Sequence, residues 1–258
     1  MTTALITGAS VGIGAAFARR LAADGYDLIL TARNTERLNQ NAAALREHYG
    51  VTVEVLPANL ATSEETARVE TRLADTGRPV DMLVNNAGFS TGKSFLGGDI
   101  EAEERMLNVL VRAVLRLSSA ALPGMVKRGQ GAIVNIASIA AYVPWGTYGA
   151  AKAWVTSFSE GLYREVAGTG VKILAVCPGA TRTEFQQRAG LDFGGIPPWM
   201  WLTAEQVVDS TLKGLRRGAT VITPSVRYKA VVIGARHTPR WLLGWISSQV
   251  APLTSRSR

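Results

Sequence analysis

The 258-residue sequence contains very little cysteine and no long hydrophobic run. Cys177 is its one cysteine, which excludes an internal disulfide, and it ends the apolar run VKILAVCP with no histidine nearby in sequence. We therefore expect Cys177 to be a buried strand residue and not a nucleophile. No uninterrupted stretch of about 20 apolar residues is present, which argues against a transmembrane helix. The first apolar run begins by Ala4, which leaves no room for a cleaved signal peptide, and we expect a cytoplasmic protein.

Acidic residues are in the minority, with 20 Asp and Glu against 28 Lys and Arg, for a net charge of +8. Such a surplus can indicate a nucleic acid partner. The cations are spread along the chain, however, and the first 225 residues contain no basic run with interleaved aromatic residues. We therefore expect no nucleic acid partner and no metal site, and we attribute the charge to attraction for a small anionic ligand or an acyl carrier.

Short apolar runs alternate with amphipathic helical segments over most of the chain. This alternation is typical of βαβ units and a parallel sheet, and the lack of strict period-two patterning indicates strands covered on both faces. No repeat, low-complexity tract or linker divides the sequence. It predicts one α/β domain over residues 1–225, with a doubly wound parallel sheet and helices on both faces. The predicted strands are Ala4–Ile6, Asp27–Thr31, Val51–Leu56, Asp81–Val84, Ala132–Ala137, Val171–Val176 and Thr220–Thr223.

A glycine-rich turn connects the first predicted strand to the first predicted helix. Gly8, Gly12 and Gly14 punctuate it, with a spacing that departs from G-x-G-x-x-G. Small residues let the backbone approach a pyrophosphate, whose charge the amides and the positive end of the following helix stabilise. The alternative is a glycine turn of the kind found in any α/β fold.

Tyr148 and Lys152 stand four residues apart in YGAAK, so on a helix their side chains leave the same face. A fixed ammonium one turn away in a dry cleft can lower the pKa of a phenol, which needs a shift of roughly 3 units to act as a base at neutral pH. The alternative is a solvated helix face on which the lysine stem packs against the ring.

Five motifs together resemble the short-chain dehydrogenase/reductase family. They are TGASVGIG, NNAG at residues 85–88, Ser138, YGAAK, and CPGATRT at residues 177–183. The resemblance implies a single Rossmann-like domain, a nicotinamide cofactor, and hydride exchange with a carbonyl or alcohol.

The end of the second predicted strand bears on which nicotinamide cofactor is used. An NAD enzyme of this architecture places a carboxylate there, whereas this sequence reads LTARN. A guanidinium at Arg33 can hold a 2′-phosphate, which favours NADP(H). The alternative is that Arg33 is a solvated residue at a helix start. In the family an aspartate usually stands where this chain has Asn59. The cofactor-binding residues that the resemblance implies are Gly8, Ser10, Gly12, Ile13, Gly14, Arg33, Asn59, Leu60, Asn86, Ala87, Gly88, Tyr148, Lys152, Pro178, Gly179 and Thr183.

The resemblance also implies four catalytic residues. Ser138 hydrogen-bonds the substrate oxygen, and Tyr148 exchanges a proton with it. Lys152 lowers the tyrosine pKa and holds the nicotinamide ribose, and Asn108 continues a proton relay. Ser138 precedes Tyr148 by ten residues, whereas about thirteen are common in the family. Tyr142 is a second candidate tyrosine, but it has no lysine four residues on.

Two segments lie outside the five motifs that resemble the family. Residues 185–203 are glycine- and proline-rich and are interpreted as a substrate lid over an apolar cavity, with apolar residues at Phe185, Leu191, Phe193, Trp199, Met200 and Trp201. Residues 226–258 form a basic, Trp-containing C-terminal extension. Its apolar set of Trp241, Leu242, Leu243, Trp245 and Ile246 either contacts a membrane surface or is covered in a subunit interface or over the substrate pocket.

The leading functional prediction is an NADP(H)-dependent oxidoreductase that exchanges hydride with a carbonyl or alcohol. A small carbonyl or acyl substrate is expected, with reduction of a hydrophobic ketone or a 3-oxoacyl group favoured, in a homo-oligomeric enzyme (dimer or tetramer). The alternative is a non-catalytic NADP(H)-binding regulator or scaffold of the same fold, a class that normally loses the tyrosine or the lysine.

Overall fold

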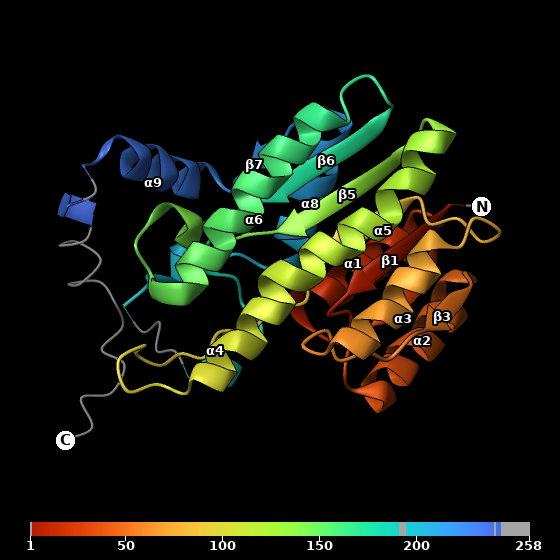
Figure 1. Cartoon of the computed structure of the whole chain (residues 1–258), viewed down its shortest axis with the longest axis horizontal. Helices are drawn as coiled ribbons and strands as arrows, with labels where there is room; N and C mark the ends of the chain where they lie inside the picture. Colours follow the sequence, from red (N-terminus) through yellow and green to blue (C-terminus); the bar gives the residue numbers. More distant parts are fainter. Residues whose placement is uncertain (1, 191–194, 240, 244–258) are drawn as a thin grey trace.

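The structure is a computed structural model that describes residues 2–190, 195–239 and 241–243. Within them, seven parallel strands form one sheet in the order β3-β2-β1-β4-β5-β6-β7 (Figure 1). The chain builds outward from β1 to β3 and then returns to place β4 on the other side of β1. This order confirms the predicted doubly wound sheet. The strands are β1 Thr3–Thr7, β2 Asp27–Thr31, β3 Val53–Val55, β4 Met82–Asn85, β5 Gly131–Ile136, β6 Val171–Val176 and β7 Val221–Ile222.

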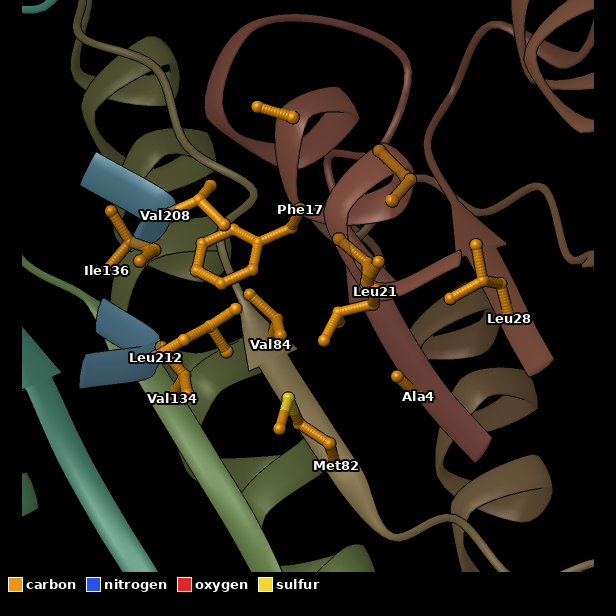
Figure 2. Close-up of a cluster of buried hydrophobic side chains, with 14 of the residues drawn as sticks. Ala4, Phe17, Leu21, Leu28, Met82, Val84, Val134, Ile136, Val208 and Leu212 are labelled. Atoms are coloured by element: carbon orange, nitrogen blue, oxygen red, sulfur yellow. The ribbon is translucent and has the colours of Figure 1, made fainter. Parts of the chain in front are cut away.

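Helices cover both faces of this sheet (Figure 1). One face packs against α1, α2 and α8, and the other against α3, α5 and α6. Figure 2 shows the first interface, where Phe17 of α1 lies among Val84 and Val134 of the sheet and Val208 and Leu212 of α8. The helical segments are α1 Gly12–Ala23, α2 Thr35–Tyr49, α3 Ser63–Ala74, α4 Ile100–Leu107, η1 Asn108–Arg112, α5 Ala113–Arg128, η2 Ile139–Tyr142, α6 Gly146–Glu165, α7 Phe185–Ala189, η3 Pro198–Met200, α8 Ala204–Arg216 and α9 Val226–His237.

The predicted strands agree closely with the observed ones. Asp27–Thr31 and Val171–Val176 have the predicted bounds. The largest difference is at β3, where only Val53–Val55 of the predicted Val51–Leu56 is strand. Among the described strands β3 pairs with β2 alone, so a single neighbour limits its ladder.

One helical stretch, residues 100–128, is long and apolar enough to cross a membrane when length and composition alone are considered. It is formed by α4, η1 and α5. Leu117 and Met125 of this stretch are fully buried in the core cluster that also contains β1 and β5 residues. One side of this stretch is therefore packed on the sheet, while Leu115 and Val126 on it are exposed.

Candidate active site

The glycine-rich turn leaves the carboxyl end of β1 and opens α1. Gly8 and Gly12 have φ values of 65° and 57°, in the left-handed region that favours glycine. Gly14 has an ordinary φ but no room, because a Cβ there would lie 2.3 Å from the carbonyl oxygen of Gly8. The turn is thus a cradle of main-chain atoms that side chains would fill, which is the form that a pyrophosphate requires.

Hydrogen bonds of the Thr7 and Asn86 side chains hold this cradle in place. The Thr7 hydroxyl accepts the backbone N–H groups of Asn86 (2.9 Å) and Ala87 (3.0 Å). The Asn86 amide donates to the carbonyl oxygens of Thr7 (2.9 Å) and Gly8 (3.2 Å). Asn86 therefore fixes the turn with its side chain, a role that the sequence did not reveal. Thr7 was not among the candidate residues, although it directly precedes the first glycine.

Three predicted residues on the adenine side of the cofactor site, Arg33, Asn59 and Leu60, have different surroundings. Arg33 follows β2 and is exposed, and its guanidinium makes no hydrogen bond or ion pair with a described residue. Asn59 accepts the N–H of Ala61 (3.2 Å), so its side chain closes its own turn. Leu60 is buried in the core, and its side chain faces α3 and α5 neighbours.

Several other predicted cofactor-binding residues lie close to the glycine cradle or to Lys152. Ile13 packs partly buried on the core next to the glycine cradle, and the Ser10 carbonyl oxygen accepts the Asn41 amide of α2 (3.1 Å). Gly88 follows β4, where a Cβ would lie 3.8 Å from Lys152 Nζ. At Gly12, a Cβ would lie 3.0 Å from Thr183 Cγ2, so the segment after β6 lies across the glycine cradle.

Ser138, Tyr148 and Lys152 meet between β5 and α6. Ser138 follows β5 and is hydrogen-bonded to the Tyr148 hydroxyl. Lys152 Nζ lies 5.8 Å from the centre of the Tyr148 ring and donates to the carbonyl oxygen of Ile136 (2.7 Å). The ten-residue spacing therefore brings serine and tyrosine together. The chain between Ser138 and α6 forms the short η2 turn, and α6 begins at Gly146, whose φ is 54°.

In the protein by itself the Tyr148 pKa is raised, so burial outweighs any lowering by Lys152, and the expected lowering by Lys152 stays a prediction. Burial raises the pKa of Tyr148 to about 12, opposed by its hydrogen bond with Ser138. Burial also lowers the pKa of Lys152 to about 8. The reason is that desolvation penalises the charged form of each group. At neutral pH the tyrosine is therefore a protonated phenol beside a charged lysine.

Asn108 begins a π-helical turn, η1, between α4 and α5. The N–H of Ala113 reaches back five residues to the Asn108 carbonyl oxygen. Its side-chain amide is half-buried and makes no hydrogen bond with any residue that the structure describes. Such single-turn bulges occur frequently at functional sites. The backbone is thus irregular at the position for which the resemblance implies a relay residue.

Aromatic rings stand on both sides of Tyr148. The Trp145 ring packs edge-on with its centre 6.3 Å away, and the Phe185 ring is tilted at 5.8 Å. A Cβ on Gly92 would lie 1.8 Å from the Ala189 carbonyl oxygen, so the loop after β4 touches the end of α7. Phe185, the first residue of the candidate lid, therefore lies beside the tyrosine. Leu191 and Phe193 of that lid lie outside the described residues.

Tyr142 points away from this cluster. Its hydroxyl lies 3.6 Å from Cys177 Sγ, and the Arg236 guanidinium lies 4.9 Å from the centre of its ring. Burial raises the Tyr142 pKa well above its usual range. Cys177 is fully buried, as expected, and the geometry selects Tyr148 over Tyr142.

The C-terminal extension is described as far as Leu243, apart from residue 240. Its first part, α9, carries cations and no acidic residue. Trp241 is 76% exposed. Trp245 and Ile246, the remaining members of the predicted apolar set, lie outside the described residues, so that prediction stays open.

Comparisons with known proteins agree with this arrangement. The short chain dehydrogenase family model matches residues 2–192. A short-chain dehydrogenase from Sphingobium yanoikuyae in complex with NADPH is 41% identical, with a TM-score of 0.84, over 92% of this chain and 94% of that one. The bulky-bulky ketone specific alcohol dehydrogenase from Comamonas testosteroni is 34% identical, with a TM-score of 0.79, over 92% of both chains.

A curated relative gives the same result. Sulfoacetaldehyde reductase 2 of Chromohalobacter salexigens is 37% identical over 186 residues, which are 70% of this chain and 73% of that protein. The matched family model, the parallel sheet and the Ser138, Tyr148 and Lys152 cluster all agree with the motifs read from the sequence. The chain belongs to the short-chain dehydrogenase/reductase family and is an oxidoreductase of that family.

Proposed function

We propose that this protein is an NADP(H)-dependent reductase of a bulky hydrophobic ketone, with a 3-oxoacyl group as the second substrate candidate. The observation that carries the proposal is the position of the Tyr148 phenol. It is hydrogen-bonded to Ser138, close to Lys152, and flanked by the rings of Trp145 and Phe185. The site therefore combines a proton donor with apolar walls.

The nucleotide side fits a dinucleotide. The cradle of Gly8, Gly12 and Gly14 has no space for side chains, and it opens the N-terminus of α1, where backbone N–H groups and the helix dipole favour an anion. Ala87 and Gly88 continue this surface at the end of β4. These residues would hold the pyrophosphate and the adjoining ribose.

Arg33 supports NADP(H) over NAD(H). Its guanidinium follows β2 and has no partner among the described residues, so it can hold a 2′-phosphate without giving up an ion pair. Arg37, one turn further on, is already bound to Glu184 by two hydrogen bonds of 2.6 and 3.1 Å. The similar chain from Sphingobium yanoikuyae, solved with NADPH, supports the same choice.

The bound nicotinamide supplies the hydride, and the residues of this chain handle the proton and the substrate oxygen. Ser138 hydrogen-bonds that oxygen and orients it toward the phenol. Tyr148 donates its proton, for which a buried phenol that stays protonated at neutral pH is suited. The Lys152 ammonium stabilises the phenolate that remains, and Asn108, whose side-chain amide makes no hydrogen bond with a described residue, is the proposed route by which a replacement proton from solvent reaches Tyr148.

The substrate side favours an apolar and voluminous ketone. Trp145 and Phe185 border the tyrosine, and Met200 of η3 packs on the core beside the segment that follows β6. The specificity of the similar enzyme from Comamonas testosteroni for bulky-bulky ketones supports the same substrate class.

A substrate panel tests the proposal. Ketones with two large substituents, small aldehydes and 3-oxoacyl thioesters are each incubated with NADPH, and NADPH consumption is followed, with Tyr148→Phe as the blank. We expect the bulky ketones to be reduced with the highest kcat/KM. Tight NADPH binding without consumption on any compound would overturn the proposal and favour the non-catalytic regulator or scaffold.

A further inference from the structure

Tyr228 connects the C-terminal extension to the interior of the enzyme. It stands in the first turn of α9 and is only 3% exposed, within the same core cluster as α1 and α8. Figure 1 shows α9 beyond the β6 and β7 edge of the sheet, away from the glycine cradle. A buried tyrosine at this point of a basic, largely exposed helix indicates a specific contact.

The ring of Tyr228 occupies the space where a side chain of residue 179 would be. A Cβ on Gly179 would lie 2.2 Å from both Cε2 and Cζ of Tyr228. Gly179 is not among the glycines with positive φ, so its backbone conformation does not require glycine. The Tyr228 ring is therefore the reason that position 179 must lack a side chain.

The hydroxyl of Tyr228 holds the next residue. It accepts the backbone N–H of Ala180 at 3.1 Å. The neighbouring backbone groups are held by main chain instead, because the Pro178 carbonyl oxygen accepts from Ile139 N (3.1 Å) and the Ala180 carbonyl oxygen accepts from Leu202 N (2.9 Å). Loss of the phenol hydroxyl would leave the part-buried Ala180 N–H without its protein partner, which weakens the hold on this segment.

We propose that Tyr228 is a positioning residue for hydride transfer. It fixes the Gly179 and Ala180 backbone through its ring and its hydroxyl. This inference rests on the proposed function, because Pro178, Gly179 and Thr183 are among the cofactor-binding residues that the family resemblance implies. Because hydride transfer depends steeply on the distance between the reacting atoms, a looser segment lowers kcat more than it weakens substrate binding.

The first experiment compares Tyr228→Phe with Tyr26→Phe. Phenylalanine keeps the ring in place and removes only the hydroxyl, and Tyr26 is a matched control because it packs on the same core cluster and makes no hydrogen bond with the described residues 178–183. We expect Tyr228→Phe to lower kcat about three- to tenfold. The KM for the ketone should change by less than about twofold, and the isotope effect with deuterated NADPH should rise. Unchanged kcat and isotope effect would overturn the proposal.

The second experiment needs no substrate. Hydrogen exchange of the 178–183 segment, measured without cofactor, should be faster in Tyr228→Phe and unchanged in Tyr26→Phe. Equal exchange in both variants would contradict the proposed hydrogen bond. If the wild type reduces no ketone but Tyr228→Phe still exchanges faster than Tyr26→Phe, the proposed function is refuted and the anchoring of the segment by Tyr228 stands.

A paired substitution tests the ring contact. Gly179→Ala alone should weaken NADPH binding by about tenfold or more, measured by fluorescence, because its Cβ collides with the ring. In the double variant Gly179→Ala with Tyr228→Leu, the smaller side chain should restore a large part of the affinity. If the double variant loses at least as much NADPH affinity as Gly179→Ala and Tyr228→Leu multiplied together, the two residues do not interact, and the ring is not the reason for glycine at position 179.

Discussion

The two sides of the cleft are held by different interactions. On the nucleotide side, the turn after β1 is fixed by buried or half-buried hydrogen bonds from Thr7 and Asn86 to main-chain atoms. Gly14 is surrounded so closely that no side chain fits. A buried polar group that loses its partner costs about 1–3 kcal/mol. This side is therefore intolerant of change at almost any of its positions.

On the substrate side, two arginines connect surface elements: the exposed Arg227 of α9 contacts η3, and the half-buried Arg37 of α2 contacts Glu184, which precedes α7. The Arg227 guanidinium lies 5.2 Å from the centre of the Trp199 ring, and Arg37 pairs with Glu184. Exposed contacts of this kind contribute about 0–1 kcal/mol each. The comparison teaches that one side can be reshaped for a new substrate while the other keeps a fixed cradle for the cofactor.

The largest effect is expected where the two sides meet, at Tyr148. Tyr148→Phe removes the proton donor and keeps the ring between Trp145 and Phe185, so turnover should fall by roughly 10²–10⁴-fold while NADPH affinity changes by no more than a few-fold. Steady-state kinetics and fluorescence titration measure the two quantities. Comparable turnover in the variant would remove Tyr148 from the chemistry.

Gly14→Ala tests the rigidity of the nucleotide side. The new Cβ would lie 2.3 Å from the Gly8 carbonyl oxygen and 2.5 Å from Asn86 Nδ2, so the cradle must distort. We expect a loss of stability of about 1–3 kcal/mol in urea unfolding, together with NADPH binding weakened by more than tenfold. Gly161→Ala is the matched control, since Gly161 also lies in a helix but has open space at its Cβ, and it should be neutral or slightly stabilising. Equal effects of the two variants would show that the cradle adjusts.

The same difference between the two sides explains what the sequence could predict. The strands, the glycine turn and the Tyr148–Lys152 spacing are local patterns, and each was read correctly from a few consecutive residues. Asn86 was placed at the right strand end, but its hydrogen bonds reach 78 and 79 residues back, and no local pattern encodes them. The raised Tyr148 pKa also depends on burial by the whole fold, which the one-turn spacing to Lys152 does not reveal.

The contacts of the substrate side were out of reach for a related reason. The Tyr228 ring meets Gly179 across almost 50 residues of sequence, and nothing in the basic composition of the extension distinguishes this tyrosine from its exposed neighbours. The sequence also does not show whether a connection of ten residues lets Ser138 reach Tyr148. In the structure a 3₁₀ turn brings the two hydroxyls together.

Arg33→Asp tests whether the cofactor choice belongs to the nucleotide side alone. A carboxylate at this position repels a 2′-phosphate and can accept a ribose hydroxyl, so the ratio of the NADP⁺ and NAD⁺ dissociation constants should shift by about tenfold or more toward NAD⁺. Arg37→Gln is the control, because Arg37 is held by Glu184. A shift in the Arg37 variant and none in the Arg33 variant would assign the phosphate to Arg37.

Lys152 gives the buried site a pH dependence. Its pKa falls from 10.5 to about 8 in the folded protein because burial disfavours the charge. Between these two values the unfolded chain holds a proton that the folded chain has released, so the free energy of unfolding rises with pH in this window. Relative to Lys152→Met, the cofactor-free wild type should therefore gain on the order of 1 kcal/mol from pH 8 to pH 9.5 in urea titrations. A pH-independent difference would mean that Lys152 is solvated.

The smallest effect is expected at the surface of the substrate side. Arg227 donates to the Trp199 carbonyl oxygen and covers its ring, so it positions η3 from α9. Because this contact is exposed and contributes roughly 0.5–1 kcal/mol, Arg227→Gln should raise the KM for a bulky ketone about two- to fourfold. The melting temperature should fall by no more than about 4 °C. The NADPH affinity should stay unchanged, since no hydrogen bond of the glycine cradle involves Arg227.

Arg217→Gln is the matched control for this variant, because Arg217 is exposed at the end of α8 and its side chain has no partner among the described residues. If Arg227→Gln instead lowers the melting temperature or NADPH affinity as strongly as Gly14→Ala does, the two sides are mechanically coupled through α9. If it changes neither KM nor stability, the Trp199 segment is positioned by its own packing. The first result would replace the division between a fixed and an adjustable side with a single cooperative site, whereas the second would remove Arg227 from the positioning of the substrate side.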